Sequence, residues 1–517
     1  MLNRADRPKA LYSCGDRPSL DNKTGDWRQI TPTEAGRPSP CRQACLLDGE
    51  IPAWLEAVKG ERWEEAWRIM RRSNPFPAIT GRVCFHPCTM ECNRRLMDQA
   101  IDIPAMERAI GMWRLERYRP PAAPRVLRGR VAVIGSGPAG LSCAYYLNEA
   151  GYRVTIFEKA PVAGGMLALG IPSYRLPREL LAEELKVLTA DGVQFRLDSA
   201  LGRDFNLEQL YGEFDQLFLA TGAWRSRALN IPGADRPGTW SALDYLTRIH
   251  LGETVPLAEP VVVIGGGNAA VDAARTALRE NGMRRVSILY RRSRAEMPAD
   301  PAEVEAAAAE GVELIFNVIP REIKGGEPLL KVLLDRTVSG DGGVKILPDD
   351  PVSMAAGSLI YALGQEPDLS FLDRLSQPRF FYAGGDLITG PATVPEAIKA
   401  GRIAAQAIAG RLAGRPETAA PPAQGAPVTF DQLNLWAVTA PQPVERQADP
   451  AEEAGRCLGC GTCNSCGICY LFCPDVAVQR EQGRYSINLD YCKGCGICAR
   501  ECPARVLTLE GGAGYAS

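Results

Sequence analysis

Cysteine is the residue type whose number and spacing point most directly to chemistry in this 517-residue chain, which holds 17 cysteines. Ten of them lie between Cys457 and Cys502, and five lie between Cys41 and Cys92. In a reducing compartment, cysteines at this density are more typical of metal ligands than of disulfides. The chain has only two histidines, which disfavours mixed Cys/His zinc sites and histidine acid–base catalysis. We therefore expect metal centres and no catalytic acid, base or nucleophile.

The C-terminal cysteines fall into two matching runs of the form CxxCxxCxxxCP. This is the spacing of bacterial ferredoxins with two clusters, in which each run gives three ligands to one [4Fe–4S] cluster and one to the other. Zinc sites use paired CxxC knuckles instead. One predicted ligand set, the Cys463 set, is Cys463, Cys466, Cys469 and Cys502. The other, the Cys492 set, is Cys473, Cys492, Cys495 and Cys498. Two cysteines just upstream, Cys457 and Cys460, are left over.

A first glycine motif, Gly135-x-Gly137-x-x-Gly140, follows an apolar strand and precedes an alanine-rich helix. These glycines allow a tight turn and let the backbone approach a pyrophosphate at the helix N-terminus. The next strand ends in Glu158, 18 residues after Gly140, where a carboxylate can accept hydrogen bonds from ribose hydroxyls. Strand, glycines, helix, strand and acid in this order predict a dinucleotide site.

A second motif begins at Gly265 and continues through Gly267 and Asn268, again after an apolar strand. Its following strand ends in Arg291 and Arg292, where the first motif has an acid. Arginine at that place suits the 2′-phosphate of NADP(H) and leaves no carboxylate for the NAD(H) ribose. The alternatives are NAD(H) as the cofactor, or a basic strand end that only faces solvent.

The elements that position these residues belong to an ordinary globular composition, with 46% hydrophobic and 23% charged residues. The formal net charge of -2 gives no reason to expect nucleic acid or an anionic membrane surface as a partner. The sequence has no apolar run of the roughly 18 residues that a membrane helix needs. Its first residues lack the apolar core of a secretory signal, so we expect a cytoplasmic protein.

The segment Ala383–Ala405, with its Gly-Gly-Asp, and the ATG at Ala220–Gly222 resemble flavoproteins with two dinucleotide-binding domains. The resemblance implies that the first domain holds FAD and that the NADP(H) domain is inserted into it. It further implies that Asp386 contacts the FAD and that the helix beginning near Thr393 points at the flavin ring.

Three further segments narrow the resemblance to the small subunit of glutamate synthase and to the N-terminal half of dihydropyrimidine dehydrogenase. They are GGMLALGIPSYRLP with Gly165, YRRSRAEMPA, and GRVCFHPCTMEC. The C-terminal stretches CNSCGICYLFCPD and DYCKGCGICARECP are similar to the δ subunit of 2-oxoacid:ferredoxin oxidoreductases. This last likeness implies a thiamine-diphosphate 2-oxoacid oxidoreductase, or a soluble ferredoxin, as the partner.

The expected fold class is α/β with several domains. We expect a helical Fe–S domain, two Rossmann-like domains, a linker and a ferredoxin-like domain. Their expected ranges are 1–122 for the Fe–S domain, 123–234 with 352–413 for the FAD domain, 235–351 for the NADP(H) domain, 414–455 for the linker and 456–517 for the ferredoxin-like domain.

The N-terminal domain of the glutamate synthase family usually opens with a CxxC that this chain lacks. The segment EEAGRCLGCG, with Cys457 and Cys460, resembles that missing piece at the other end of the chain. We therefore hypothesise that both cysteines fold back to form the fold-back set, which is Cys41, Cys92, Cys457 and Cys460. A second N-terminal cluster would use Cys45, Cys84, Cys88 and Glu107. The alternative is that Cys457 and Cys460 are spare thiols. Cys14 has no assigned role.

Four clusters would bring about sixteen irons per chain. The parts together predict a subunit that passes electrons between NADP(H), FAD and [4Fe–4S] clusters within a multi-subunit oxidoreductase, with a 2-oxoacid enzyme as the expected partner. Two alternatives stay open. One is the glutamate synthase small subunit itself, and the other is a non-catalytic redox sensor or assembly protein.

Overall fold

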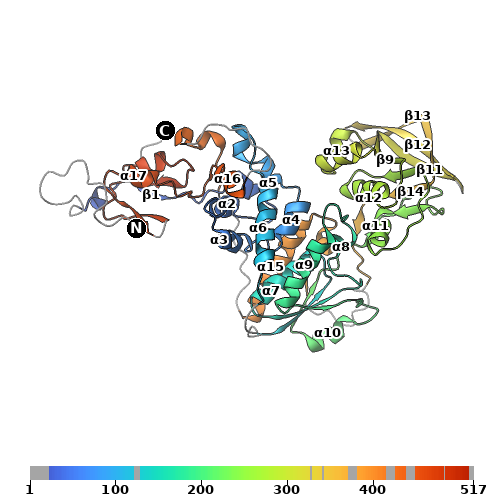
Figure 1. Cartoon of the computed structure of the whole chain (residues 1–517), viewed down its shortest axis with the longest axis horizontal. Helices are drawn as coiled ribbons and strands as arrows, with labels where there is room; N and C mark the ends of the chain where they lie inside the picture. The colour runs from blue at the N-terminus through green and yellow to red at the C-terminus, as the bar shows by residue number, and fades with distance from the viewer. Residues whose placement is uncertain are drawn as a thin grey trace. The chain divides into compact units, whose positions relative to one another are not determined.

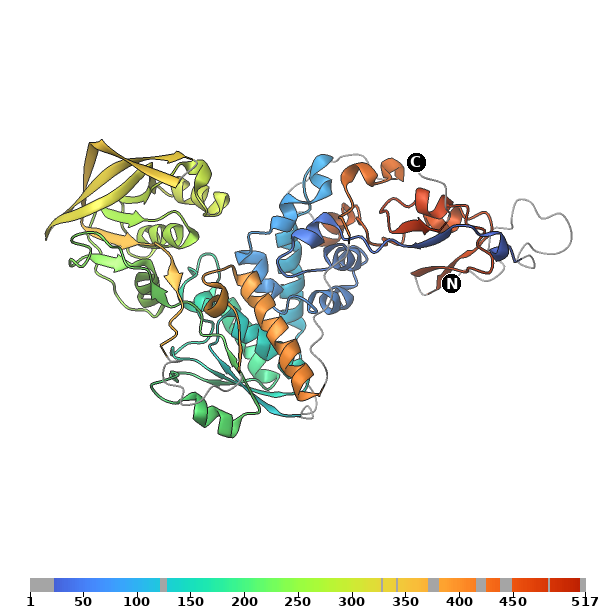
Figure 2. The ribbon, with the colours of Figure 1, turned by 180° about the vertical axis from the view of Figure 1, so that it is seen from behind.

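The computed structural model describes residues 23–120, 128–326, 329–340, 343–370, 381–414, 425–437, 449–481 and 484–511. Cys14 lies outside these residues. The chain forms two compact units, whose helices and strands are labelled in Figure 1 and seen from behind in Figure 2. Unit 1 is Met1–Pro77, His86–Arg114 and Ala419–Ser517, and unit 2 is Ala78–Phe85 and Leu115–Thr418.

Unit 2 contains two five-stranded parallel sheets, each with a glycine motif at the end of a central strand. The first sheet has the order β16-β5-β2-β3-β4. Its strands are β2 (Arg130–Ile134), β3 (Arg153–Phe157), β4 (Gln194–Arg196), β5 (Gln216–Leu219) and β16 (Tyr382–Ala383). The apolar runs of β2 and β3 are buried, as expected of a parallel sheet covered on both faces. Its main helices are α7 (Pro138–Glu149), α9 (Arg178–Ala190), α10 (Leu207–Glu213) and α15 (Val394–Leu412).

Helices α7 and α15 cross at very short range, although more than 200 residues separate them in the chain. A Cβ atom added to Gly401 would collide with the carbonyl oxygen of Ala139. The hydroxyl of Ser142 donates to the carbonyl of Ile398 at 2.7 Å. The late segment therefore completes the domain that the first glycine motif begins.

The second sheet has the order β10-β9-β8-β14-β7, again parallel throughout. Its strands are β7 (Thr239–Ser241), β8 (Val261–Ile264), β9 (Val286–Tyr290), β10 (Glu313–Phe316) and β14 (Ser358–Tyr361). Its helices are α11 (Ala242–His250), α12 (Asn268–Arg279) and α13 (Pro301–Ala309). A separate antiparallel sheet packs against it, formed by β11 (Val318–Gly326), β12 (Leu329–Gly340) and β13 (Gly343–Ala356). The two parallel sheets confirm the predicted fold class.

The predicted end of the NADP(H) domain at residue 351 is wrong. Strand β14 begins only at Ser358 and pairs with β8 and β7 of the second sheet. The chain returns to the first domain beside the short antiparallel pair of β6 (Arg225–Ser226) and β15 (Gln365–Glu366). A short buried run such as SLIY pairs equally well in either sheet, so its apolar pattern does not reveal which sheet it joins.

The helical part of unit 1 confirms the predicted helical N-terminal domain. Its helices are α1 (Pro40–Ala44), α2 (Ile51–Lys59), α3 (Trp63–Met70), α5 (Pro87–Met90), α6 (Ile103–Arg117) and α16 (Pro450–Gly455). Its core contains fully buried Trp54, Leu55 and Ile110, together with several cysteines. Helix α4 (Pro77–Val83) falls almost wholly in unit 2.

The ferredoxin-like part of unit 1 contains α17 (Ile468–Leu471), α18 (Ile497–Arg500) and the hairpin of β17 (Val478–Glu481) and β18 (Arg484–Ile487). Its last strand, β19 (Leu507–Glu510), pairs with β1 (Thr31–Glu34) from the other end of the chain. The range 1–122 is therefore wrong as a single domain, because its beginning belongs to the ferredoxin-like part.

The predicted linker 414–455 is also wrong in the segments that the structure describes. Val428 is fully buried and packs with Leu433, Leu458 and Cys460. The guanidinium of Arg37 donates to the carbonyl of Pro427 at 2.7 Å. The abundant Pro, Ala and polar residues of this segment obscured its two apolar anchors, Val428 and Leu433, and its composition gave no sign of the contact with Arg37.

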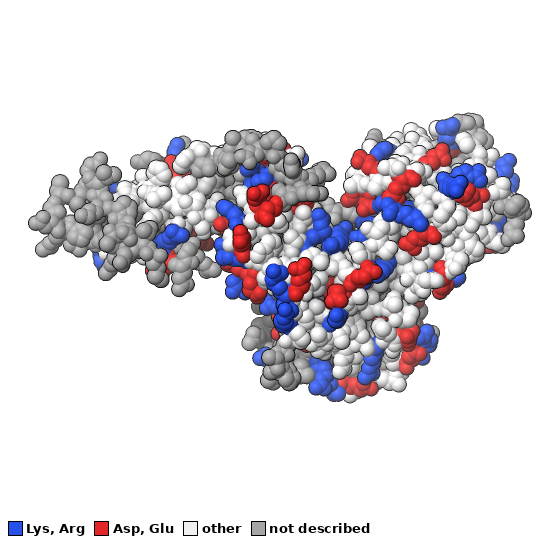
Figure 3. Space-filling view, in the orientation of Figure 1, with Lys and Arg blue, Asp and Glu red and all other residues white. Residues whose placement is uncertain are grey.

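No helix in the described ranges is long and apolar enough to cross a membrane. On the face drawn in Figure 3, basic and acidic side chains are interspersed in the coloured parts of the surface.

Candidate nucleotide and iron–sulfur sites

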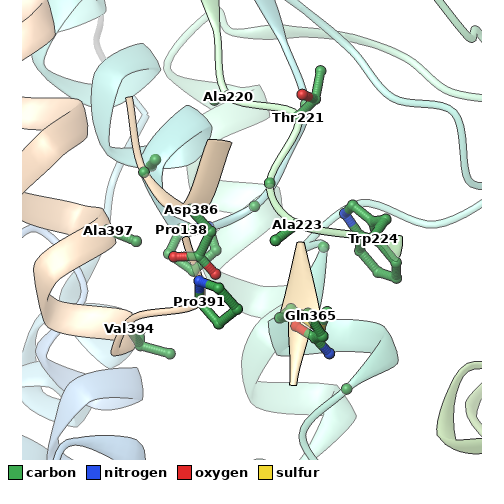
Figure 4. Close-up of a pocket in the computed structure, with 18 of the residues that line it drawn as sticks. Pro138, Ala220, Thr221, Ala223, Trp224, Gln365, Asp386, Pro391, Val394 and Ala397 are labelled. Carbon is green, nitrogen blue, oxygen red and sulfur yellow. The ribbon is translucent and has the colours of Figure 1, made fainter. Parts of the chain in front are cut away.

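A cavity of about 760 Å³ opens in unit 2, at the ends of strands from both parallel sheets. The first glycine motif lines it with Gly135 and Gly137, and the second lines it with Asn268. Glu158, Gly165, Asp386 and Thr393 also line it. The structure thus brings most of the predicted nucleotide-binding residues to one cavity, part of which is shown in Figure 4.

Gly135 and Gly137 of the first motif have different roles. Gly135 has φ +105°, and a Cβ atom there would collide with the carbonyl of Ala220, so it makes the turn. At Gly137 a Cβ atom would meet nothing within 4 Å. This open position lies at the N-terminus of α7, where backbone N–H groups and the helix dipole favour an anion. Gly267 leaves the same open space at the start of α12. Both sites fit a pyrophosphate.

Glu158 is buried and its carboxylate holds the first glycine loop in place. Its Oε2 accepts hydrogen bonds from the backbone N–H of Ser136 at 2.9 Å and from the Ser136 hydroxyl at 2.6 Å. Its Oε1 accepts one from the N–H of Ala160 at 2.9 Å. An ionised carboxylate has about four acceptor positions, so capacity for a ribose hydroxyl remains. The predicted ribose contact stays a prediction.

Asp386 and the N-terminus of α15 form one side of the cavity. Burial raises the pKa of Asp386 to about 6, and its Oδ1 accepts a hydrogen bond from the N–H of Ala392 at 3.2 Å. The Thr393 hydroxyl caps α15 by accepting a hydrogen bond from the N–H of Glu396 at 3.4 Å, and it donates to Glu396 Oε2 at 2.7 Å. Figure 4 shows Asp386 and Val394 on one side of the view, with Trp224 on the other. The Trp224 ring and the N-terminus of α15, a helix of 19 residues, therefore border the same cavity.

Sequence reasoning missed Lys159 and Trp224, which both line the cavity. The Lys159 ammonium lies 4.8 Å from the centroid of the Trp224 ring, and burial lowers the pKa of Lys159. Lys159 follows the predicted ribose acid and Trp224 follows the ATG motif, so their place in the sequence was the available signal.

An ion pair joins the two nucleotide domains beside the cavity. The Arg175 guanidinium, from the first domain, donates to both oxygens of Asp272 on α12 at 3.0 and 2.9 Å. Burial raises the pKa of Asp272 to about 6, against the pull of Arg175. Arg291 is exposed just beyond the end of β9, and Arg292 is half-buried beside it. Neither arginine lines the cavity. Their contact with a 2′-phosphate stays a prediction.

The four cysteines of the fold-back set gather in the helical part of unit 1. The thiol of Cys41 lies within electrostatic reach of Cys457, Cys92 and Cys460. The Asn93 side chain donates to Cys460 Sγ at 3.4 Å, and the N–H of Gly459 donates to Cys457 Sγ at 3.4 Å. Burial raises the pKa of Cys457 to about 12, so a bare thiolate there is unfavourable without a bound cation.

A buried polar network holds the returning segment against the N-terminal helices. Arg456 donates to Asp98 at 3.0 Å and to Glu453 at 2.8 Å. Glu453 accepts the backbone N–H of Asp102 at 2.8 Å, and Arg94 donates to the carbonyl of Arg456 at 3.2 Å. Arg94 also holds the pKa of Asp98 well below its usual range. The predicted fold-back is thus matched by specific contacts across more than 350 residues.

The second N-terminal set is divided between the two units. Cys45, Cys88 and Glu107 belong to unit 1, whereas Cys84 belongs to unit 2. The pKa of Cys45 is raised by burial and further by Glu107, which places these two groups near each other. His86 Nε2 lies 3.3 Å from Glu107 Oε2. Ligation by this set stays a prediction.

Both ferredoxin sets are gathered as their spacing predicts. Burial and, after it, the neighbouring thiols of the Cys463 set raise the pKa of Cys469 to about 12. A small cavity is lined by the whole Cys492 set, Cys473, Cys492, Cys495 and Cys498. Among the described residues, no group of three or more His, Cys, Asp or Glu side chains is arranged to hold a single metal ion. Four thiolates converging on a common space fit a [4Fe–4S] cluster, which takes four cysteines.

Comparisons with known proteins agree with this architecture. The pyridine nucleotide-disulphide oxidoreductase family matches residues 129–401, and dihydropyrimidine dehydrogenase domain II, a 4Fe–4S cluster domain, matches residues 34–118. A 4Fe–4S binding domain matches residues 485–508. These matches confirm the predicted FAD and NADP(H) domains and the multiple [4Fe–4S] clusters.

Three curated relatives are similar over most of the chain. The NADPH-Fe(3+) oxidoreductase subunit beta of Geobacter sulfurreducens is 38% identical over 65% of this chain and 52% of that protein. The NADP(+)-dependent formate dehydrogenase subunit beta of Moorella thermoacetica is 37% identical over 77% of this chain and 62% of that protein. The glutamate synthase [NADPH] small chain of Escherichia coli is 32% identical over 71% of this chain and 87% of that protein.

The chain spans about half the length of the first of these relatives and nearly all of the glutamate synthase small chain. The predicted resemblance to that small chain and to dihydropyrimidine dehydrogenase is confirmed. The chain belongs to the pyridine nucleotide-disulphide oxidoreductase family, in its glutamate synthase small chain-like branch, with added 4Fe–4S domains.

Proposed function

We propose that this chain is the NADP(H)-handling electron-transfer subunit of a multi-subunit oxidoreductase. One observation carries the proposal: a single cavity is lined by both glycine motifs, through Gly137 of the first and Asn268 of the second. A nicotinamide held by one motif and a flavin held by the other would meet in that space. A bound flavin supplies the chemistry that exchanges a two-electron hydride for single electrons.

The chain's own side chains bind and orient in this proposal. The loop that Glu158 anchors holds the first pyrophosphate at α7, and the opening at Gly267 admits the second at α12. The Arg175–Asp272 pair ties α12 to the first domain, so that it would hold a nucleotide bound at α12 in a fixed place relative to the first glycine loop. No side chain has to act as a general base or nucleophile. The four predicted ligand sets would each hold a [4Fe–4S] cluster, and such clusters would supply one-electron transfer between the flavin and a partner.

The partner we propose is a thiamine-diphosphate 2-oxoacid oxidoreductase. Support comes from the C-terminal stretch, whose YLFCPD and DYCKGCGICARECP resemble the δ subunit of those enzymes. The beta subunits of the NADPH-Fe(3+) oxidoreductase and of the formate dehydrogenase are also parts of larger assemblies by name, which supports a partner of some kind.

A second candidate is the small subunit of glutamate synthase, favoured by the 87% coverage of the Escherichia coli small chain. The two ferredoxin sets at the C-terminal end weigh against it, because the ordinary small subunit lacks such a domain. A redox sensor that keeps the fold without turnover is the third candidate.

The test has two stages. Anaerobic reduction of methyl viologen by NADPH should proceed at many turnovers per minute if the chain is an electron-transfer subunit, whereas a sensor shows none. A tagged pull-down from the native cell is then assayed for NADP+ reduction with 2-oxoacids plus coenzyme A, with formate, and for glutamate formation. Activity with 2-oxoacids plus coenzyme A, and in neither of the other two assays, supports the proposed partner. Activity with formate or glutamate formation would reject that partner and keep the electron-transfer role.

A further inference from the structure

The segment Lys23–Glu34 contains no residue of the nucleotide or cluster motifs, yet it packs as part of the ferredoxin-like part of unit 1. Its strand β1 pairs along its whole length with β19. The N–H of Gly25 donates to the carbonyl of Asp490 at 2.8 Å, and the Thr24 hydroxyl donates to the carbonyl of Tyr491. The segment is therefore held at both ends, and it runs beside the residues that lead into the second cysteine run.

The segment lies directly on the loop that carries two ligands of the Cys492 set. A Cβ atom added to Gly494 would collide with the carbonyl of Ile30. On the other side, a Cβ atom added to Gly25 would collide with the carbonyl of Leu489. Pro32 lines the small cavity together with all four cysteines of the set. The N-terminal segment is thus part of the wall of this site.

Arg28 places a permanent positive charge at that wall. Its Nη1 donates to the carbonyl of Leu489 at 2.6 Å and to the carbonyl of Cys492 at 3.3 Å. The side chain is half-buried, so solvent screens it less than a fully exposed cation. Two lysines lie nearby, but each has its own carboxylate: Lys493 pairs with Asp475 at 3.2 Å and Lys23 with Asp490 at 3.1 Å.

We propose that Arg28, delivered by the N-terminal segment, raises the reduction potential of the cluster held by the Cys492 set. Reduction adds one negative charge to the cluster, and a fixed cation hydrogen-bonded to the backbone of the ligand residue Cys492 stabilises the reduced form more than the oxidised form. Net charge, hydrogen bonding and solvent exposure are the levers that set such potentials. The inference rests on the proposed assignment of the four cysteines. It gives one end of the chain control over the cluster at the other end.

The test compares midpoint potentials in the full-length, anaerobically loaded protein by redox titration followed by electron paramagnetic resonance. In Arg28→Gln the charge is lost. We expect the equilibrium between oxidised and reduced cluster to shift three- to tenfold toward the oxidised form for one titration wave, where tenfold equals 59 mV for one electron. The wave of the Cys463 set should stay in place and serve as the internal reference.

Arg28→Lys and Lys23→Gln are the matched controls. Arg28→Lys keeps a charge but loses the guanidinium Nη1 that donates to both carbonyls, so its midpoint should fall between that of Arg28→Gln and that of the unchanged protein. Lys23→Gln removes one charge from the same segment, where the structure gives it contact with Asp490 and no cysteine, and should move neither wave.

Iron content separates this inference from the cluster assignment. If Arg28→Gln keeps its iron and neither wave moves, the proposal is overturned while the assignment stands. If Arg28→Gln loses iron, Arg28→Met takes its place as the variant without the charge, and an unchanged midpoint in Arg28→Met overturns the proposal. Equal shifts of both waves also overturn it, since the effect would then be a general one.

Discussion

The fold-back set and the Cys492 set are both groups of four cysteines in unit 1, and they are built in opposite ways. All four members of the Cys492 set lie within one stretch of 26 residues, and three of them belong to a single CxxCxxC loop. The fold-back set joins residues more than 350 positions apart and lies among helices whose core includes Trp54 and Ile110. Local backbone geometry gathers the first set, whereas tertiary packing gathers the second.

The two cysteine sets therefore depend on different interactions and should respond differently to mutation. A loop that gathers its own ligands depends on little beyond its spacing. The fold-back set depends on the ion pairs of Arg456, Glu453 and Asp98, which hold the returning segment in place. Damage to the fold-back set should therefore affect both a cluster and the attachment of the C-terminal part, while damage to the Cys492 set should stay local.

The largest effect should follow from Cys457→Ala combined with Cys460→Ala. We expect the loss of about four irons per chain, which is one cluster. Viologen reduction by NADPH should fall at least a hundredfold if electrons must pass through this cluster, while direct reduction of the flavin by NADPH persists. Iron analysis and stopped-flow flavin bleaching measure the two quantities. The matched variant Cys495→Ala should lose the same amount of iron but leave the thermal stability nearly unchanged. Full iron content in the double variant would show that the two thiols are spare.

Asp98→Asn should break the attachment itself. Removing one partner of a buried ion pair costs about 3 kcal/mol, because Arg94 loses its carboxylate and Arg456 keeps only Glu453. The pKa of Asp98 is lowered in the folded state, so its contribution is present above its ordinary value near pH 4 and is lost as the pH falls further. Thermal unfolding at pH 7 and at decreasing pH measures this.

Arg62→Gln is the control for that experiment, since it removes an exposed ion pair with Glu65 in the same unit. Such pairs contribute under about 1 kcal/mol. If Asp98→Asn and Arg62→Gln shift the unfolding temperature equally, the network does not hold the returning segment.

A mutation in a glycine motif should, like one in the Cys492 set, affect only its own site. It should weaken nucleotide binding and leave the fold intact. In Gly137→Ala the new methyl group meets no protein atom, so the fold should survive, but it occupies the space for a pyrophosphate. We expect FAD affinity to fall at least tenfold with little change in the unfolding temperature of the apoprotein. Gly267→Ala should leave FAD bound and raise the KM for NADPH instead. Retained FAD in Gly137→Ala would place the pyrophosphate elsewhere.

The smallest effect should come from Arg291→Ala and Arg292→Ala. If either guanidinium contacts the 2′-phosphate of NADPH, its loss should raise the KM for NADPH about fivefold to tenfold, since a charged hydrogen bond contributes about 1.5 kcal/mol. The KM for NADH should change less than twofold. Steady-state viologen reduction with both nucleotides measures the ratio. An equal change for both nucleotides would reject the role in NADP(H) selection.

The sequence was most informative where chemistry depends on adjacent residues. The two glycine motifs and the ferredoxin sets were found because their spacing alone fixes a turn, a helix start or a ligand loop. The fold-back set was found only through a resemblance and a count of missing cysteines, and no local pattern marks its contacts through Asn93 and Arg456. The partner strands of β14 and of β1 could not be predicted either, because a run of only four residues carries no information about which strand it pairs with.

Arg28 and Val428 show the same limit at the level of single residues. One is a cation in a polar N-terminal stretch and the other an apolar residue after a proline-rich segment, and both acquire their roles from distant loops. By contrast, Glu158 lies at the end of its strand as its sequence position indicates. In the structure its carboxylate accepts hydrogen bonds from Ser136 and Ala160.

The four-cluster assignment is tested most directly by the iron and acid-labile sulfide content of the anaerobically purified full chain, counted per FAD. We predict about sixteen irons, four for each of four clusters. The fold-back set and the second N-terminal set would each add one cluster to the two of the ferredoxin-like part. A value near eight would mean that only the ferredoxin sets hold clusters, and it would contradict the fold-back of Cys457 and Cys460 as a metal site.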